Sequence, residues 1–179
     1  SEKNKSIRFG LAAIKGVGLK SMKSLVLERN ENGPFLDIID FMARLSGEII
    51  NKRQLEKLIQ AGCFDEFEIN RSKLFENVPN FVEIYGGSKV VNDNQSLLFK
   101  DTKNSFLDEN LFLQDVTEWT SGYLLKSELE VIGFYFTNHP ISLYPKNFFL
   151  QNNILECNEV LNNKDLKSAK IVASILDVK

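Results

Sequence analysis

Apolar residues recur every three or four positions through residues 1–86, which is the spacing of helices that bury one face. Two short helices are predicted around a glycine pair at 11–30, and further helices at 37–45, 51–62 and 71–85. Asp37 and Asn51 are placed to start two of them, whereas Pro79 falls inside the last. We therefore expect residues 1–86 to form an all-helical unit. The residues predicted to face its core are Leu11, Ile14, Leu19, Met22, Leu25, Val26, Ile38, Phe41, Met42, Leu45, Leu55, Leu58, Ile59, Leu74, Phe75, Val78, Phe81 and Val82.

The pattern weakens after residue 86. Turn-forming residues cluster at 86–88 and 92–94, and 108–110 is polar again, so we expect 87–117 to be a linker around one apolar cluster, Leu97-Leu98-Phe99. A helix from about Glu118 to Val131 is expected to open a helical and extended subdomain at 118–165. The segment from Lys170 to Lys179 alternates β-branched residues and predicts a strand without a partner in the chain. The chain is therefore expected to stop just inside a further domain, at 168–179.

Composition indicates a cytoplasmic protein with a local basic region. The 179 residues are 43% hydrophobic, and the net charge of −2 argues against a uniformly basic nucleic-acid binder. Residues 1–75 nevertheless carry 13 basic against 10 acidic side chains, and residues 76–179 carry 9 against 14. No apolar run is long enough to predict a membrane span, and no secretion signal opens the chain. Cys63 and Cys157 stand far apart and are expected to be reduced thiols.

The run from Ile14 to Lys20 carries the most informative chemistry. Two glycines in the pattern Gly-x-Gly let a turn between helices reach positive φ and approach another surface closely. Their amides, with those that open the next helix, would form a phosphate site, and neighbouring lysines would add positive charge. Such a site contacts phosphate oxygens and no base edges. The predicted DNA-binding residues are Lys15, Gly16, Val17, Gly18, Leu19, Lys20, Ser21 and Lys23.

The two glycines do not fit the common nucleotide-binding motifs. A dinucleotide fingerprint needs a third glycine where Ser21 stands, and the spacing of a Walker loop is not met. A tight turn between helices that binds no ligand remains an alternative. Residues 51–65 look like a second, imperfect copy of the hairpin with one glycine, Gly62. Two hairpins side by side would span both strands across a minor groove, or the second copy would be purely structural.

Four stretches together resemble the bacterial replicative DNA polymerase III alpha subunits, in the region just after the polymerase fingers. The resemblance implies a mainly α fold, with a tandem helix-hairpin-helix domain at 1–86 that holds newly made duplex DNA. It also implies a small helical clamp-binding subdomain, and the first strand of an OB-fold cut off at Lys179. The matching stretches are Ile7-Arg8-Phe9-Gly10-Leu11-x-Ala13-Ile14-Lys15-Gly16-Val17-Gly18, Glu28-Arg29-Asn30 with Gly33-Pro34-Phe35, Asn51-Lys52-Arg53-x-Leu55-Glu56-x-Leu58-Ile59-x-Ala61-Gly62-x-Phe64-Asp65, and Leu129-Glu130-x-Ile132-Gly133-Phe134-Tyr135-x-x-x-His139-Pro140.

The resemblance further implies a peptide that binds the ring-shaped sliding clamp, the beta subunit. Leu98 and Phe99 would fill an apolar pocket on the clamp, and Gln95 would hydrogen-bond at its rim. Leu97 would add a lesser apolar contact. The predicted clamp-binding residues are Gln95, Ser96, Leu97, Leu98 and Phe99.

By the same resemblance, the parent protein is a DNA-directed DNA polymerase whose Mg²⁺-binding carboxylates lie upstream, so we expect no catalytic site, metal or cofactor in this chain. The expected partners are duplex DNA, the sliding clamp and other subunits of the polymerase III holoenzyme, with no membrane. His139 is expected to stabilise a turn, and Trp119 to pack against the helix it opens. Two alternatives remain: a helix-hairpin-helix module of a repair protein or nuclease, and a protein-interaction scaffold whose hairpin binds nothing.

Overall fold

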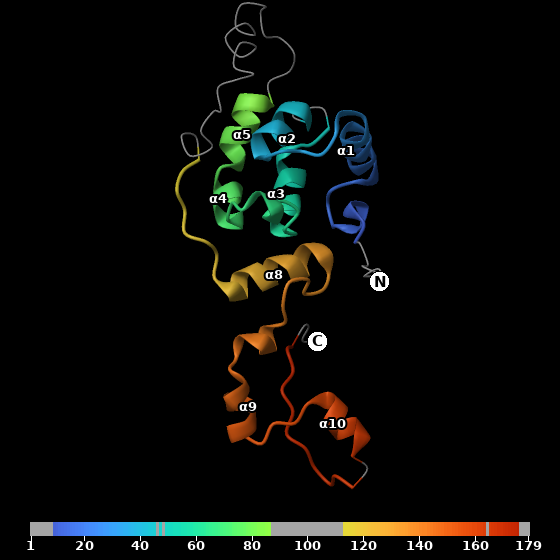
Figure 1. The fold of residues 1–179 in the computed structure, drawn as a ribbon, viewed down its shortest axis with the longest axis vertical. Helices are drawn as coiled ribbons and strands as arrows, with labels where there is room; N and C mark the ends of the chain where they lie inside the picture. The colour runs from blue at the N-terminus through green and yellow to red at the C-terminus, as the bar shows by residue number, and fades with distance from the viewer. Residues whose placement is uncertain (1–8, 46, 48, 87–112, 164, 176–179) are drawn as a thin grey trace, which may run out of the picture.

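A computed structural model describes residues 9–45, 47, 49–86, 113–163 and 165–175. The described residues form helices and no strand, which confirms the mainly α class (Figure 1). The elements are η1 (Leu11–Ala13), α1 (Leu19–Asn32), α2 (Ile38–Leu45), α3 (Lys52–Gln60), η2 (Asp65–Phe67), α4 (Arg71–Glu76), α5 (Val78–Tyr85), α8 (Ser121–Ile132), η3 (Pro140–Leu143), α9 (Lys146–Gln151) and α10 (Cys157–Asn162).

Helix α3 lies at the centre of the helical body and contacts α4, α5 and α8. Its Leu55 and Ile59 are fully buried, and Leu58 is 1% exposed. Burial of each such side chain stabilises the fold by about 1.5–3 kcal/mol. Helix α2 contributes all four of its predicted core residues, Ile38, Phe41, Met42 and Leu45. The predicted helical periods are thus confirmed where one face meets the core.

Both predicted helix caps are present. The Asp37 side chain accepts a hydrogen bond from the amide of Asp40 at 2.7 Å, at the start of α2. The Asn51 side chain accepts one from the amide of Gln54 at 3.0 Å, while the Gln54 side chain accepts one from the amide of Asn51 at 3.0 Å. This reciprocal capping box fixes the first turn of α3.

Three details of the predicted helices are wrong. The segment 71–85 is two helices, α4 and α5, because Pro79 has no amide hydrogen with which to continue the hydrogen bonds of α4. It lies in the first turn of α5 instead, where that hydrogen is not needed. The first helix of the 11–30 segment is only the single 3₁₀ turn η1. Leu19 is 58% exposed, since the hairpin places it at the surface in the first turn of α1.

Helix α8 begins at Ser121, three residues later than predicted, because the Thr120 side chain accepts a hydrogen bond from the amide of Tyr123 at 3.4 Å. Glu118 instead caps another helix: its carboxylate accepts from the amides of Arg71 at 2.8 Å and Ser72 at 3.1 Å. This carboxylate therefore holds the segment before α8 against the N-terminus of α4, where negative charge is favourable.

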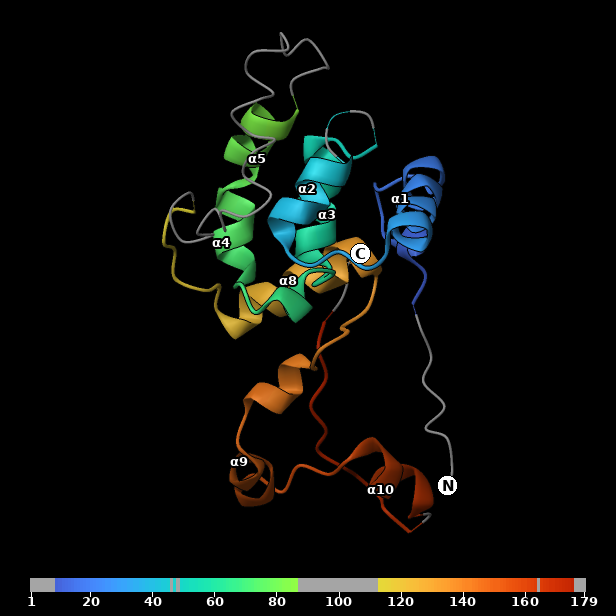
Figure 2. The same cartoon turned by 45° about the horizontal axis from the view of Figure 1, so that its top comes forward.

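Helices α9 and α10 and residues 165–175 lie on the far side of α8 from the helical body (Figure 1 and Figure 2). No described residue after Ile132 is buried. The strand predicted from Lys170 is not found at 170–175: Lys170 forms one isolated parallel bridge with Ile154, and 176–179 lie outside the described residues. A strand is defined by its ladder, and residues 170–175 find no partner in the described part of the chain with which to continue one. No helix of the described residues has the length and apolarity needed to cross a membrane.

Candidate nucleic-acid interface

The hairpin between η1 and α1 has the backbone that its two glycines predict. Gly16 and Gly18 have φ of +88° and +75°, which side chains rarely tolerate. Val17 between them is fully buried and Ile14 is 4% exposed. The apolar residues of the hairpin therefore anchor it in the core and leave its glycines at the surface.

The amides of the hairpin are free to bind an external group. The amide of Lys15 donates to the carbonyl of Val131 at 2.8 Å, and the amide of Met22 donates to that of Gly18 at 3.2 Å. The amide of Val17 is enclosed with its fully buried residue. The other amides between these two bonds, those of Gly16 and of residues 18–21, find no acceptor in the described part of the chain. The first turn of α1 also has no side-chain cap and no acidic residue. Its positive dipole end is therefore exposed and uncompensated.

The three predicted lysines are exposed around this turn. Lys15 lies in the hairpin, and Lys20 and Lys23 lie in the first two turns of α1. None of them joins an ion pair with a described residue. The structure thus brings together unpaired positive charge and unbonded amides, which is the combination that binds phosphate at helix N-termini.

Gln54 holds the hairpin in place, and the sequence analysis did not identify it. Its side-chain nitrogen donates to the carbonyl of Val17 at 2.5 Å and to the hydroxyl of Ser21 at 3.0 Å. Its side-chain oxygen is committed to the capping box of α3, which fixes its orientation. The Asn51-x-x-Gln54 spacing marks this glutamine as a capping residue. Its contact with a hairpin more than thirty residues away has no local signal.

The second hairpin has no comparable free surface. The amides of Gly62 and Cys63 donate to the carbonyls of Ile59 and Leu58 at 2.9 and 3.0 Å. Gly62 has φ of +76°, close to the +75° of Gly18 in the first hairpin. A Cβ on Gly62 would, however, collide with the guanidinium of Arg71. This hairpin is therefore covered by a side chain of the chain itself.

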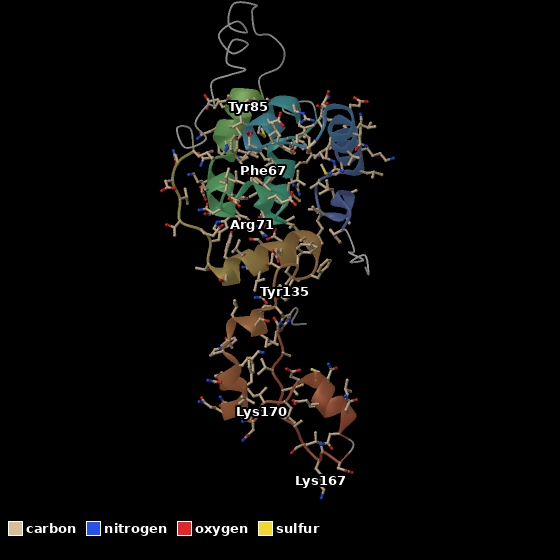
Figure 3. The ribbon with its side chains drawn as sticks, in the orientation of Figure 1. Phe67, Arg71, Tyr85, Tyr135, Lys167 and Lys170 are labelled. Atoms are coloured by element: carbon tan, nitrogen blue, oxygen red, sulfur yellow. The ribbon has the colours of Figure 1, made fainter. Side chains whose placement is uncertain are left out.

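Arg71 joins the second hairpin to α8 (Figure 3). Its guanidinium donates to both carboxylate oxygens of Asp65, at 2.8 and 2.6 Å, and to Glu128 at 3.0 Å. Burial by itself would lower the pKa of Arg71, but the carboxylates of Asp65 and Glu128 raise it by more. The pKa therefore lies above its ordinary value, and the guanidinium stays charged. The sequence analysis missed this network, whose members are 6 and 57 residues apart along the chain.

Glu128 is fully buried and extends the same network into the following loop. Its second carboxylate oxygen accepts from the amides of Phe136 at 2.9 Å and Thr137 at 3.0 Å. The residues after α8 are thereby tied to α8, and through Arg71 to the second hairpin. The polar groups of this second region are satisfied internally, in contrast to those of the first hairpin.

The remaining predicted residues have structural roles or lie outside the described residues. Trp119 packs against Phe75 and Tyr123, with ring centroids 5.3 and 4.9 Å apart, as predicted. His139 accepts a hydrogen bond from the amide of Ile141 at 3.2 Å and so stabilises the predicted turn. The predicted clamp-binding peptide at 95–99 falls within 87–112, outside the described residues.

Comparisons with known proteins agree with this geometry. Residues 1–74 match a family model described as a helix-hairpin-helix motif. The chain is 36% identical over 138 residues to the DNA polymerase III subunit alpha of Neisseria meningitidis serogroup B, which covers 77% of this chain and 12% of that protein. It is 36% identical over 177 residues to the Rickettsia bellii subunit, and this alignment covers 97% of this chain and 15% of that protein.

The Campylobacter jejuni subunit is 34% identical over 172 residues, 95% of this chain and 14% of that protein. The chain thus spans between 12% and 15% of the length of these relatives. The similarity covers 77% of the chain in one of these relatives and nearly all of it in the other two. The chain therefore belongs to the DNA polymerase III alpha subunit family, and it corresponds to a segment that contains a helix-hairpin-helix motif.

Proposed function

We propose that the Gly16–Gly18 hairpin binds the phosphate backbone of duplex DNA without sequence preference. The observation that carries this proposal is the set of amides at Gly16 and 18–21, which have no acceptor among the described residues. They lie at the open N-terminus of α1, beside three lysines that form no ion pair with a described residue. Adjacent amides hydrogen-bond the oxygens of one phosphate, and the lysines attract the neighbouring phosphates. No base edge is read by this arrangement, so it holds DNA of any sequence.

The rest of the hairpin keeps these amides in place. Val17 is buried beneath the turn, and Gln54 donates to its carbonyl and to Ser21. Both contacts use a carbonyl and a hydroxyl, so neither occupies an amide of the turn. A preorganised turn loses little conformational freedom when a phosphate binds, which favours affinity.

The parent protein is proposed to be a DNA-directed DNA polymerase of chromosomal replication, as the relatives are named. In that protein the nucleotidyl transfer, with Mg²⁺ held by carboxylates, is assigned to residues outside this chain. The described residues serve as a holding module: they bind duplex behind the reaction and carry no step of it.

The peptide Gln95-Ser96-Leu97-Leu98-Phe99 is proposed to bind the sliding clamp, within a holoenzyme of further subunits. A few phosphate contacts and a short peptide are each weak by themselves. When both act on one DNA molecule, each raises the effective concentration of the other, and binding strengthens by about 10²–10⁴. The two contacts would together keep the polymerase on its template.

The hairpin is tested by titration of the chain with labelled duplex DNA at two salt concentrations. Lys15→Ala, Lys20→Ala and Lys23→Ala together should abolish measurable binding. A matched triple variant, with Lys146, Lys167 and Lys170 changed to Ala, removes the same charge from exposed lysines beyond α8 and should bind as the parent does. Equal binding by the hairpin triple variant and the parent would contradict the proposal and favour the scaffold alternative.

The peptide is tested by surface binding to the cognate clamp. Leu98→Ala with Phe99→Ala should remove binding, because the two side chains are the proposed anchors. Phe106→Ala with Leu107→Ala is the matched control, since it removes an aromatic and an aliphatic side chain from the same segment. Unchanged affinity of the first variant would show that the peptide is not the contact.

A further inference from the structure

The first turn of α3 lies against the first hairpin and continues its surface. Gln54 in this turn bonds to Val17 and Ser21, and a Cβ on Gly16 would lie 3.6 Å from the Cγ of Lys57. Gln54 and Lys57 are one turn apart, so the side of α3 that carries them runs along the hairpin. Leu55, Leu58 and Ile59 of the same helix are buried in the core.

Arg53 flanks this hairpin side of α3. It precedes Gln54 directly and stands four residues before Lys57, which places Arg53 and Lys57 on one side of the helix. Arg53 is exposed. It belongs to the same first turn of α3 as Gln54, whose side chain bonds to Ser21 in the N-terminal turn of α1 that carries Lys20.

The other cations of α3 are neutralised. Lys57 pairs with Glu130 at 3.1 Å and also donates to Gln60 at 2.9 Å. Lys52 points to a different side of the helix and lies 3.9 Å from the carboxylate of Glu56. Arg53 joins no ion pair with a described residue. It is thus the uncompensated charge of α3 next to the hairpin.

The backbone at the start of α3 is less open than that of the first hairpin. The capping box uses the amides of Asn51 and Gln54, and Arg71 covers the hairpin that follows α3. A side chain is therefore the better candidate for a second contact in this half of the molecule. A guanidinium suits this role, because its planar set of donors matches two phosphate oxygens at once.

We propose that Arg53 makes a second phosphate contact on the duplex held by the first hairpin. The DNA-binding surface then consists of Lys15, Lys20, Lys23 and Arg53 around the open amides, and it crosses from α1 to α3 at Gln54. The inference rests on the proposed function of the hairpin. In this proposal the other point of contact with DNA is the start of α3, and not the second glycine hairpin that follows α3.

The test is duplex DNA titration of the full chain over a series of salt concentrations. Arg53→Ala should weaken binding about tenfold, as loss of a charged hydrogen-bond partner does. It should also reduce the magnitude of the log–log salt slope by about 0.9, since one phosphate contact is lost. Lys52→Ala removes the same charge from the same turn of α3, on the side away from the hairpin, and should leave the slope unchanged. Arg53→Lys should keep the slope, because the charge remains. It should lose part of the affinity, because an ammonium cannot form the bidentate contact of a guanidinium with two phosphate oxygens.

The outcomes separate this inference from the proposed function. If the triple lysine variant of the hairpin weakens binding while Arg53→Ala and Lys52→Ala behave alike, Arg53 makes no contact and the inference fails alone. If the triple lysine variant binds as the parent does, the hairpin proposal fails as well. Thermal melting of both α3 variants shows whether the fold is intact; exposed charges at this position should alter stability equally little.

Discussion

The two glycine hairpins of this chain share a backbone and differ in what surrounds them. Each places a glycine at φ between +75° and +88° after a helix or a helical turn. At the first hairpin the amides of Gly16 and 18–21 have no acceptor among the described residues, and the three lysines around them form no ion pair there. At the second, the amides of Gly62 and Cys63 bond to α3, and the guanidinium of Arg71 covers the glycine.

This difference shows that a glycine turn between helices does not by itself make a binding site. The turn supplies close approach, but the neighbours decide whether the amides face solvent or the protein. Arg71, held by Asp65 and Glu128, occupies the approach to Gly62 that a phosphate would need. Gln54 instead supports the first hairpin through Val17 and leaves its amides open. The first hairpin therefore presents its glycines at the surface, and the second joins α3 to α8.

The largest expected effect is on stability, at the second hairpin. Arg71→Ala leaves Glu128 buried without its cation, and we expect the free energy of unfolding to fall by about 3–5 kcal/mol. Urea denaturation followed by circular dichroism measures the change. Lys73→Ala breaks a pair with the fully solvated Asp115, 3.4 Å away, and should cost less than about 1 kcal/mol. Similar losses in both variants would show that the Arg71 network does not hold the fold.

An effect of intermediate size is expected when alanine replaces one glycine of each hairpin. Both Gly18→Ala and Gly62→Ala place a side chain at positive φ, which costs about 1–3 kcal/mol. At Gly62 the new methyl also collides with Arg71, whereas at Gly18 it lies 3.5 Å from the side-chain nitrogen of Gln54. Gly62→Ala should therefore lower the melting temperature more, while Gly18→Ala should weaken DNA binding more.

Both glycine variants are compared by thermal melting and by duplex titration below the lower melting temperature. The two measurements should rank the variants in opposite order: Gly62→Ala should lose more stability, and Gly18→Ala should lose more DNA affinity. That result would distinguish a structural hairpin from a binding hairpin. A larger loss of DNA affinity in Gly62→Ala than in Gly18→Ala would reverse the assignment of the two hairpins.

The smallest expected effect is at the link between α3 and the first hairpin. Gln54→Met removes the hydrogen bonds to Val17 and Ser21 with little change of volume, and we expect a loss of about 1 kcal/mol in stability. DNA affinity should fall severalfold because the hairpin is less well held. Asn51→Ala is the control: it breaks the same capping box, at a cost of about 0.5–2 kcal/mol, but leaves the Gln54 contacts with the hairpin. Equal DNA affinity of the two variants would show that Gln54 does not position the hairpin.

Prediction from the sequence succeeded where interactions are local. The apolar periods of α2 and α3 are set by residues three and four apart, and the caps by Asp37 and Asn51 within one turn. It failed where neighbours in space override the local pattern: Leu19 fits the apolar period of α1 but is 58% exposed, and Glu118 caps α4 instead of opening α8. The strand predicted at 170–179 depends on a partner, which residues 170–175 do not find among the described residues.

The sequence by itself determined the helical class, the glycine pair with its lysines, and the resemblance that the relatives confirm, because each depends on residue types at short, fixed spacings. The tertiary structure decided which hairpin is open. That outcome depends on Gln54 reaching Val17 across 37 positions and on Arg71 reaching Glu128 across 57. Such contacts leave no periodic trace in a single chain, since they are fixed only when separate helices pack together.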